Sequence, residues 1–223
     1  MTSARPSIIA DGVFVELGGV MLLGSTSLVV ASGEVTAVVG PSGSGKTTLL
    51  RCLSGLITVT GGEVRVSGES FSGRSVAWRA AFRRTHIGMI FQDPELLDEL
   101  SIEENVALPL LFSGEPRSSA LKRARESLVE VGVGHLAHRR IHQVSGGEAQ
   151  RVSVARAMVV AGRCIVADEP TASLDQDNAH AVARLIVDHA HSQEVATVIS
   201  THDPAVAELC DHVVSLRREV SVR

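Results

Sequence analysis

Aromatic residues are scarce in this chain of 223 residues, of which they make up 3%, and tyrosine is absent. No apolar run approaches the ~20 residues that a helix needs to cross a bilayer, so any association with a membrane is expected to be peripheral. The N-terminus lacks an apolar core followed by a small-residue cleavage site, and we therefore expect no signal peptide. The net charge is −4 without a long basic run, which argues against nucleic acid as a partner.

Cysteine is also rare in the chain. Cys52, Cys164 and Cys210 are far apart in sequence, and no two of them have the C-x-x-C spacing of a metal or redox site. We expect reduced thiols that are packed in the interior of a cytosolic protein.

Hydrophobic residues make up 44% of the chain, which is enough for a large buried core. The first ~35 residues predict short strands separated by turns at Gly12, Gly18-Gly19 and Ser32-Gly33. Further strands are predicted over 35–39, 61–66, 87–91, 164–167 and 195–200, and helices over 46–56, from 101 onward, over 118–131, 145–161 and 175–191, with a short one opened by Asp203-Pro204. Apolar strands that alternate with helices predict an α/β fold, in which a parallel sheet is covered on both faces.

One segment carries the sequence G-x-x-x-x-G-K-[ST] between a predicted strand and a predicted helix. Its residues are Gly40, Pro41, Ser42, Gly43, Ser44, Gly45, Lys46, Thr47 and, directly after the motif, Thr48. Glycines let backbone N–H groups face phosphate oxygens at a helix N-terminus. We expect Lys46 to reach the β- and γ-phosphates, Thr47 to offer its hydroxyl to Mg²⁺, and Thr48 to reach the region of the α-phosphate. The motif predicts a site for a nucleoside triphosphate and leaves many functions open.

The apolar segment 164–167 ends in two carboxylates, Asp168 and Glu169. Mg²⁺ takes hard oxygen ligands, so Asp168 suits a role near this ion, usually through water. Glu169 follows where the strand ends beside the γ-phosphate, and a carboxylate there can orient and deprotonate an attacking water. Two acidic residues after a core strand are common and do not by themselves indicate a catalytic site. Together with the phosphate loop, they indicate a site for a nucleotide and its metal ion.

Three further segments accompany these motifs. They are Gln92 after the strand 87–91, Ser145-Gly146-Gly147-Glu148-Ala149-Gln150 at the start of the helix 145–161, and Thr201-His202-Asp203 after the strand 195–200. Ser145 with Glu148 also fits a capping box, a structural role that is compatible with a functional one. With the motifs in this order, the chain resembles the ATP-binding subunits of ABC transporters over nearly its whole length.

This resemblance implies a single ABC ATPase domain over residues 1–223. Its core is expected to be a RecA-like P-loop NTPase fold with a mainly parallel sheet. An N-terminal antiparallel β subdomain is expected at about 1–35 and 61–75, and an inserted α-helical subdomain at about 93–155.

The resemblance also implies that the chain binds ATP and Mg²⁺ and hydrolyses the ATP. Thr47, Gln92 and Asp168 would lie at the metal, and Gln92 would also contact the attacking water. Glu169 and His202 would be catalytic, with His202 holding the γ-phosphate and Glu169 in geometry.

The helix that begins at Ser145 is expected to complete the site of a second subunit. In the family, Ser145 and the amide of Gly147 would meet the γ-phosphate held by the opposite subunit, because a positive helix end and bare N–H groups are stabilised by a phosphate. The expected assembly is a head-to-tail homodimer that buries two ATP molecules.

The sequence departs from the family at the adenine. Most relatives carry an aromatic residue, usually Tyr, upstream of the phosphate loop, and this position falls on Leu17, with Phe14 nearby. Three alternatives follow: Leu17 packs on the ring by dispersion alone, Phe14 substitutes for the aromatic residue, or adenine selectivity is weak. A lost stacking face should cost about 0.5–1.5 kcal/mol. The tail departs as well, with Leu216-Arg217-Arg218-Glu219 where relatives often have an Asp-Gly turn and a strand.

The segment from Leu96 to Phe112 resembles one branch of the family, which powers macrolide export, lipoprotein release and cell-division permeases. The first hypothesis is therefore a transporter subunit, cytoplasmic and peripheral on the inner face of the cell membrane, that drives a separate integral-membrane permease by export or mechanical work. The surface near Gln92–Leu100 would form part of the groove for that permease, and its apolar residues could equally be core.

Two alternative functions stand beside this one. A soluble ABC ATPase of DNA repair or translation is disfavoured by the single nucleotide domain and by the absence of a coiled-coil insertion from the sequence. A nucleotide-gated regulatory module with little turnover is disfavoured by the presence of Glu169 and His202.

Overall fold

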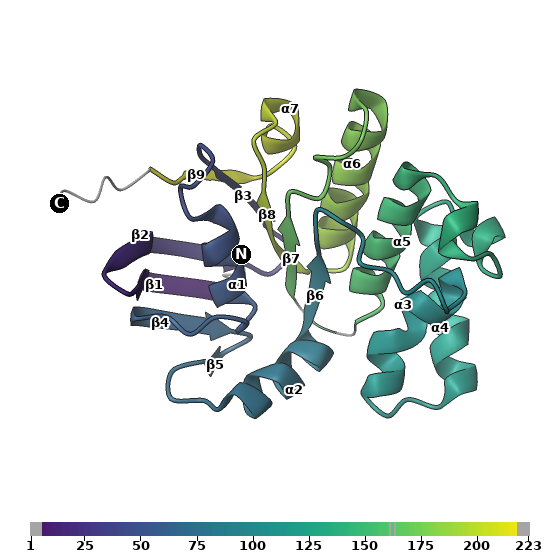
Figure 1. Cartoon of the computed structure of the whole chain (residues 1–223), viewed down its shortest axis with the longest axis horizontal. Coiled ribbons are helices and arrows are strands. Elements are labelled where there is room, and N and C mark those ends of the chain that lie inside the picture. Colours follow the sequence, from purple (N-terminus) through teal and green to yellow (C-terminus); the bar gives the residue numbers. More distant parts are fainter. Residues whose placement is uncertain (1–5, 161, 163, 218–223) are drawn as a thin grey trace.

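The computed structural model describes residues 6–160, 162 and 164–217. These residues form two β-sheets, with helices packed against them (Figure 1). The parallel sheet has the strand order β6-β7-β8-β3-β9, with β3 (Val35–Val39), β6 (Ile87–Ile90), β7 (Cys164–Asp168), β8 (Ala196–Ser200) and β9 (His212–Ser215). The antiparallel sheet has the order β2-β1-β4-β5, with β1 (Pro6–Leu17), β2 (Val20–Ala31), β4 (Gly61–Val66) and β5 (Glu69–Ser70). The predicted α/β class, with a parallel sheet and an N-terminal antiparallel sheet, is confirmed.

The helices are α1 (Lys46–Leu53), α2 (Val76–His86), α3 (Ile102–Phe112), α4 (Arg117–Glu130), α5 (Gly146–Met158), α6 (Gln176–Ser192) and α7 (Pro204–Ala207), with 3₁₀ turns at Gly134–Leu136 and Ile141–Gln143. α3, α4 and α5 form a helical block beside the parallel sheet, on the side away from the antiparallel sheet (Figure 1). Among the described residues, no helix combines the length and the apolar character that a bilayer crossing requires.

The parallel sheet separates two hydrophobic cores, and β7 shows how. Cys164 and Val166 face the core that contains α1 and the antiparallel sheet, whereas Ile165 and Ala167 face the core that contains α5 and α6. Successive side chains of a strand point to opposite faces, so a strand that is covered on both faces needs apolar residues at every position. This explains why the predicted strands read as continuous apolar runs.

The first strands are longer than the sequence predicted. β1 and β2 have 12 residues each and are joined by a turn at Gly18-Gly19, whose φ angles are 59° and 80°. Gly12, predicted as a turn, lies inside β1, where the pairing register shifts between Ala10 and Val13. The prediction of a turn at Gly12 was wrong, because a bulge absorbs the irregular residue and lets the strand continue.

Other element boundaries differ by a few residues from those predicted. α1 ends at Leu53 and α5 at Met158, each three residues earlier than expected. α2 was not predicted; Ser75 caps it, with its hydroxyl accepting a hydrogen bond from the Trp78 amide. In the tail, Leu216 and Arg217 follow β9, whereas Arg218 and Glu219 lie outside the described residues.

Candidate active site

The loop between β3 and α1 lines a cleft of about 430 Å³ at the carboxyl edge of the parallel sheet. The residues that line it are Met21, Leu22, Ser42, Gly43, Ser44, Gly45, Lys46, Thr47, Thr48 and Glu169. Gly45 has a φ of 95°, and a Cβ atom there would lie 2.8 Å from the carbonyl oxygen of Leu22, so the close approach of β2 to the loop requires glycine. Gly45 also precedes α1 without a side-chain cap, which leaves the first amides of the helix to an anion.

Lys46 is one of the residues that line this cleft. Its Nζ atom donates a hydrogen bond of 2.9 Å to the carbonyl oxygen of Gly40 and lies 3.6 Å from Oε1 of Glu169. The Lys46 side chain is 11% exposed, so its charge faces the cleft in a partly desolvated setting where it attracts anions strongly.

Asp168 brings three oxygen-bearing side chains together at the end of β7. Its Oδ1 atom accepts hydrogen bonds from the hydroxyl of Ser200 at 2.6 Å and from that of Thr47 at 3.2 Å. Thr47 and Asp168 were predicted to lie at a common site, and the structure brings them into contact. Ser200 was not predicted, although a polar residue that ends an apolar strand beside Asp168 is the signal that would have found it.

Glu169 is held from both sides. Its Oε2 atom lies 2.8 Å from Nδ1 of His202, and its Oε1 atom faces Lys46. The backbone of Glu169 is left-handed, with a φ of 47°, and its amide donates to the hydroxyl of Ser200 at 2.9 Å. A non-glycine residue in this conformation is strained, and such strain is typical of functional sites.

Gln92 lies outside this cluster. It is exposed, two residues after β6, and does not line the cleft. The residue before it, Phe91, accepts a hydrogen bond of 3.1 Å from Nε2 of Gln150, whose side chain is fully buried in α5. The backbone beside Gln92 is thus tied to the helical block through Phe91.

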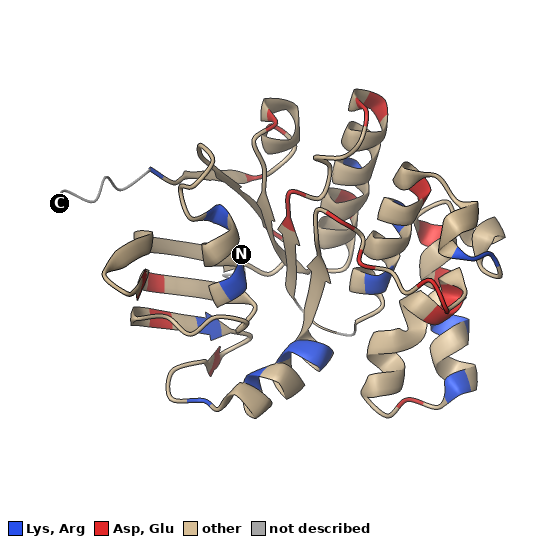
Figure 2. Cartoon of the chain, in the orientation of Figure 1, with Lys and Arg blue, Asp and Glu red and all other residues tan. Residues whose placement is uncertain are grey.

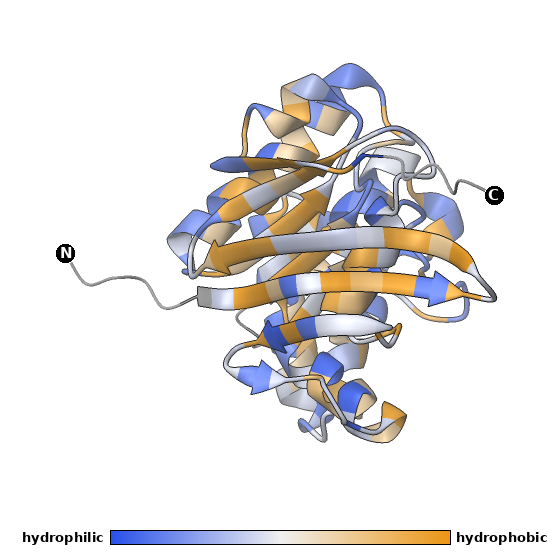
Figure 3. Ribbon diagram, turned by 90° about the vertical axis from the view of Figure 1, so that its left-hand side faces the viewer, coloured by the Kyte–Doolittle hydropathy of each residue, from blue (hydrophilic) through white to orange (hydrophobic). Residues whose placement is uncertain are grey.

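The candidate residues for adenine differ in their exposure. Leu17 is 70% exposed at the end of β1 and does not line the cleft, whereas Met21 and Leu22 of the adjacent strand do. Phe14 packs its ring on Gly61 of β4, while its neighbours Val13 and Val15 are buried in the core. Phe14 therefore lies on the outer face of the antiparallel sheet, which faces the viewer in Figure 3.

Ser145 and Gly147 form a second group, at the N-terminus of α5. Ser145 and Glu148 form the predicted capping box: the Ser145 hydroxyl accepts from the Glu148 amide, and Oε2 of Glu148 accepts from the Ser145 amide at 2.7 Å. The hydrogen bonds that Ser145 donates lower the pKa of Glu148. The amides of Gly146 and Gly147 find no acceptor in the described part of the chain, and no residue of α5 lines the cleft.

Comparisons with known proteins agree with this geometry. The chain matches the protein family described as "ABC transporter" over residues 23–172. It is 44% identical over 197 residues to the lipoprotein-releasing system ATP-binding protein LolD of Chromohalobacter salexigens, with 88% of this chain and 83% of the relative aligned. It is 39% identical over 198 residues to the macrolide export ATP-binding/permease protein MacB of Bradyrhizobium diazoefficiens, covering 89% of this chain and 30% of the relative.

Among solved structures, the chain is similar to a dimeric post-hydrolysis state of the ATP-binding cassette MJ0796 bound to ADP and Pi. The TM-score is 0.86 at 30% identity, with 95% of this chain and 94% of the other covered. These similarities confirm the predicted family and branch and favour the transporter subunit over the two alternative functions. The chain belongs to the ABC transporter family, as an ATP-binding subunit that hydrolyses ATP.

Proposed function

We propose that two copies of this chain close head to tail around two molecules of ATP and thereby drive a membrane permease of the lipoprotein-release and macrolide-export branch. The observation that carries the proposal is the position of Glu169, held between Lys46 and His202 at the wall of a cleft formed by the phosphate loop.

In the reaction, Glu169 accepts the proton of a water whose oxygen forms a new bond to the γ-phosphorus. The bond between that phosphorus and the bridging oxygen breaks, and ADP leaves. His202 fixes the direction of the Glu169 carboxylate, since its Nδ1 atom lies 2.8 Å from Oε2. Lys46 neutralises charge on the transferred phosphoryl group.

The oxygen atoms around Asp168 fit a magnesium ion. The Thr47 hydroxyl and the Asp168 carboxylate already contact each other at 3.2 Å, and hydroxyl, carboxylate and water oxygens are the donors that Mg²⁺ takes. Thr47 and Asp168 would hold the ion, and Gln92 would approach from the segment after β6. When bound, the ion neutralises charge on the phosphate oxygens.

The N-terminus of α5 is proposed to complete the site of the opposite copy. The amides of Gly146, which is exposed, and of Gly147, which is half-buried, carry the positive end of the helix dipole and have no acceptor among the described residues. Ser145 adds a hydroxyl at the same end. The structural relative MJ0796 is described as dimeric with ADP and Pi, which supports such a pairing.

Adenine is proposed to lie against apolar side chains of the β1–β2 hairpin. Leu17 is exposed next to the hairpin turn, while Met21 and Leu22 line the cleft. Dispersion contacts between adenine and these side chains then take the place of stacking on an aromatic ring. Phe14 faces away from the cleft.

The permease is proposed to dock on a groove of about 290 Å³ between α2, α3 and the segment after β6. Phe112, which is 66% exposed, and Met89 supply apolar surface. The exposed Arg84 and Glu95 give the groove charges of both signs, so an amphipathic segment fits. Docking there would place the chain at the inner face of the membrane. The relatives named for lipoprotein release and macrolide export support a permease of this branch.

Cysteine cross-linking between different chains tests the shared site. One chain carries Ser42→Cys in the phosphate loop, the other carries Gly146→Cys at α5, and both carry Glu169→Gln to retain ATP. We expect a disulfide-linked dimer when the two are mixed with ATP and Mg²⁺, and much less without nucleotide. Each of the two variants alone, which carries one introduced cysteine besides the three native ones, is the matched control and should give no such band. Equal cross-linking with and without ATP, or none in either case, contradicts the head-to-tail arrangement.

A further inference from the structure

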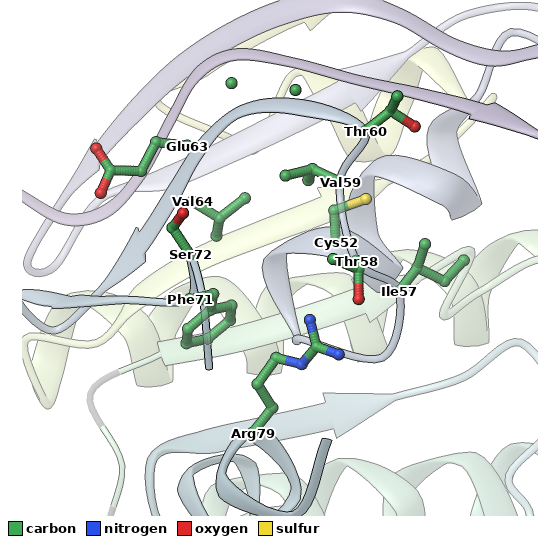
Figure 4. Close-up of a pocket in the computed structure, with 13 residues that line it drawn as sticks. Cys52, Ile57, Thr58, Val59, Thr60, Glu63, Val64, Phe71, Ser72 and Arg79 are labelled. Atoms are coloured by element: carbon green, nitrogen blue, oxygen red, sulfur yellow. The ribbon is translucent and has the colours of Figure 1, made fainter. Parts of the chain in front are cut away.

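A second cavity, of about 260 Å³, lies away from the nucleotide cleft, between the end of α1, β4 and the start of α2 (Figure 4). It shares no lining residue with the cleft. Its apolar wall contains Ile57, Val59 and Phe71, and its mouth is polar at Thr58 and Ser72. Nothing in the reaction proposed above uses this cavity.

Arg79 of α2 points into this cavity while being almost completely buried. The residue is 7% exposed, and Figure 4 shows its guanidinium between Phe71 and Thr58. Its Nε atom is inaccessible and has no hydrogen-bond partner, and the guanidinium contacts no carboxylate among the described residues. A buried charge without a partner is costly, and such charges are normally paired.

The neighbouring groups leave the charge of Arg79 uncompensated. Glu63 also lines the cavity, but its carboxylate is taken by Arg65 at 2.8 Å and by the Ser70 hydroxyl at 2.7 Å. Cys52 stays neutral, because burial raises the pKa of its thiol to about 11.

The helix itself adds positive charge and no negative charge. α2 carries three arginines and no acidic residue (Figure 2). One of them, Arg83, has its pKa lowered by burial and by the charge of Arg79, although its guanidinium donates to the carbonyl oxygen of Ser54. Arg79 is the one of the three that lines the cavity, and an anion bound beside it would offset its charge and the repulsion from Arg83.

We propose that this cavity binds a small organic anion, with its carboxylate or phosphate head group on the guanidinium of Arg79 and a short apolar part against Ile57, Val59 and Phe71. Guanidinium binds planar oxyanions through two parallel hydrogen bonds, and a pocket with one placed charge and apolar walls is typical of small-molecule sites. The volume admits only a small ligand.

The test measures binding of sodium hexanoate, sodium acetate and inorganic phosphate to the full chain by calorimetry and by thermal unfolding. Saturating ADP occupies the phosphate loop, and sodium chloride matches the ionic strength. We expect saturable binding of hexanoate, at least about tenfold tighter than that of acetate because of its buried methylenes. Saturable binding of phosphate instead would assign a phosphate head group to the same site.

Arg79→Met is the decisive variant, since methionine fills a similar space without charge. We expect a melting temperature above that of the parent without ligand, and at least about a tenfold loss of anion affinity. Arg84→Met, with the same charge change on the exposed side of α2, is the matched control and should bind like the parent. If Arg79→Met does not fold, Thr58→Glu places a competing carboxylate at the mouth and should weaken binding. Absence of saturable binding for all three anions, or undiminished binding by the variants, overturns the proposal.

Discussion

His202 and Glu169 are in contact across two neighbouring strand ends: Nδ1 of the histidine, after β8, lies 2.8 Å from Oε2 of the glutamate, after β7. The other glutamate oxygen faces Lys46, so the proposed base, the residue proposed to orient it and the proposed phosphate-binding cation form one chain of contacts.

The first prediction separates the base from the residue that orients it. Glu169→Gln keeps the shape of the side chain but removes the proton acceptor, so kcat for ATP should fall by about 10²–10⁴. His202→Ala leaves the base in place but no longer fixes the orientation of its carboxylate, and we expect kcat to fall by about 100-fold. Steady-state ATPase assays measure both rates.

Nucleotide binding provides the control for these two variants. Glu169→Gln removes the negative charge that faces Lys46 but keeps a side chain of the same shape, and His202→Ala leaves the phosphate loop untouched. The affinity for ATP should therefore stay within a few-fold of the parent in both variants. If Glu169→Gln turned over ATP at the parent rate, the assignment of the base would be wrong.

The second prediction concerns magnesium. Asp168→Asn removes the negative charge that accepts hydrogen bonds from Ser200 and Thr47. We expect the Mg²⁺ concentration for half-maximal ATPase activity to rise by about tenfold or more. ATP binding without Mg²⁺ should not weaken, because a negative charge beside the phosphates is lost. A magnesium dependence equal to that of the parent contradicts a metal role for Asp168.

These site residues could be predicted from sequence because each follows a recognisable apolar strand. Parallel strands bring their carboxyl ends to one edge, so Lys46, Asp168, Glu169 and His202 had to converge once the strands were correctly placed. Ser200 was missed, because its position at the end of an apolar strand becomes a signal only when that strand is known to lie beside the one that ends in Asp168. The proposed contact of α5 with a second copy follows from the family resemblance and not from the strand pattern, because residues of two chains would form it.

The third prediction concerns adenine. Leu17→Tyr supplies the missing ring face, and a stacked ring adds about 0.5–1.5 kcal/mol, which is up to about tenfold in affinity for ATP. Phe14→Leu is the control and should leave the affinity unchanged, because the Phe14 ring packs on Gly61. Titration with a fluorescent ATP analogue compares the variants. If Leu17→Tyr does not bind ATP more tightly than the parent, or if Phe14→Leu binds it more weakly, adenine does not lie against Leu17 as proposed.

The antiparallel sheet shows where sequence patterns are less reliable. A glycine between apolar segments usually indicates a turn, yet Gly12 lies in a bulge of β1. Only the pairing of β1 with β2 and β4 distinguishes a bulge from a turn at this position. α2 was missed because its buried side, with Arg79 and Phe82, is narrow and carries a charged residue.

The fourth prediction concerns stability. Glu104 caps α3 by accepting from the Ser101 amide and pairs with Arg117, and these contacts lower its pKa to about 2. The ionised side chain therefore stabilises the fold above the unfolded pKa of about 4.3 and loses this effect as the pH falls towards 2. Glu104→Ala should lower the free energy of unfolding at pH 7 by about 1 kcal/mol.

Urea denaturation at several pH values measures this effect. The difference between Glu104→Ala and the parent should shrink between about pH 4.5 and 2. Glu104→Gln keeps the capping hydrogen bond without the charge, so it should lose less at pH 7. A difference that does not change over this range of pH would contradict the role of the charge.

The most direct test of the head-to-tail proposal is the mass of the Glu169→Gln chain in solution, measured by light scattering behind a sizing column. With ATP and Mg²⁺ we predict a species of twice the 23.5 kDa of the chain, and with ADP or no nucleotide a single chain. Ser145→Arg in the same background places a positive, bulky side chain at the end of α5 and should abolish the dimer. A Glu169→Gln chain that binds ATP and stays monomeric, or a dimer that persists without nucleotide, contradicts the account.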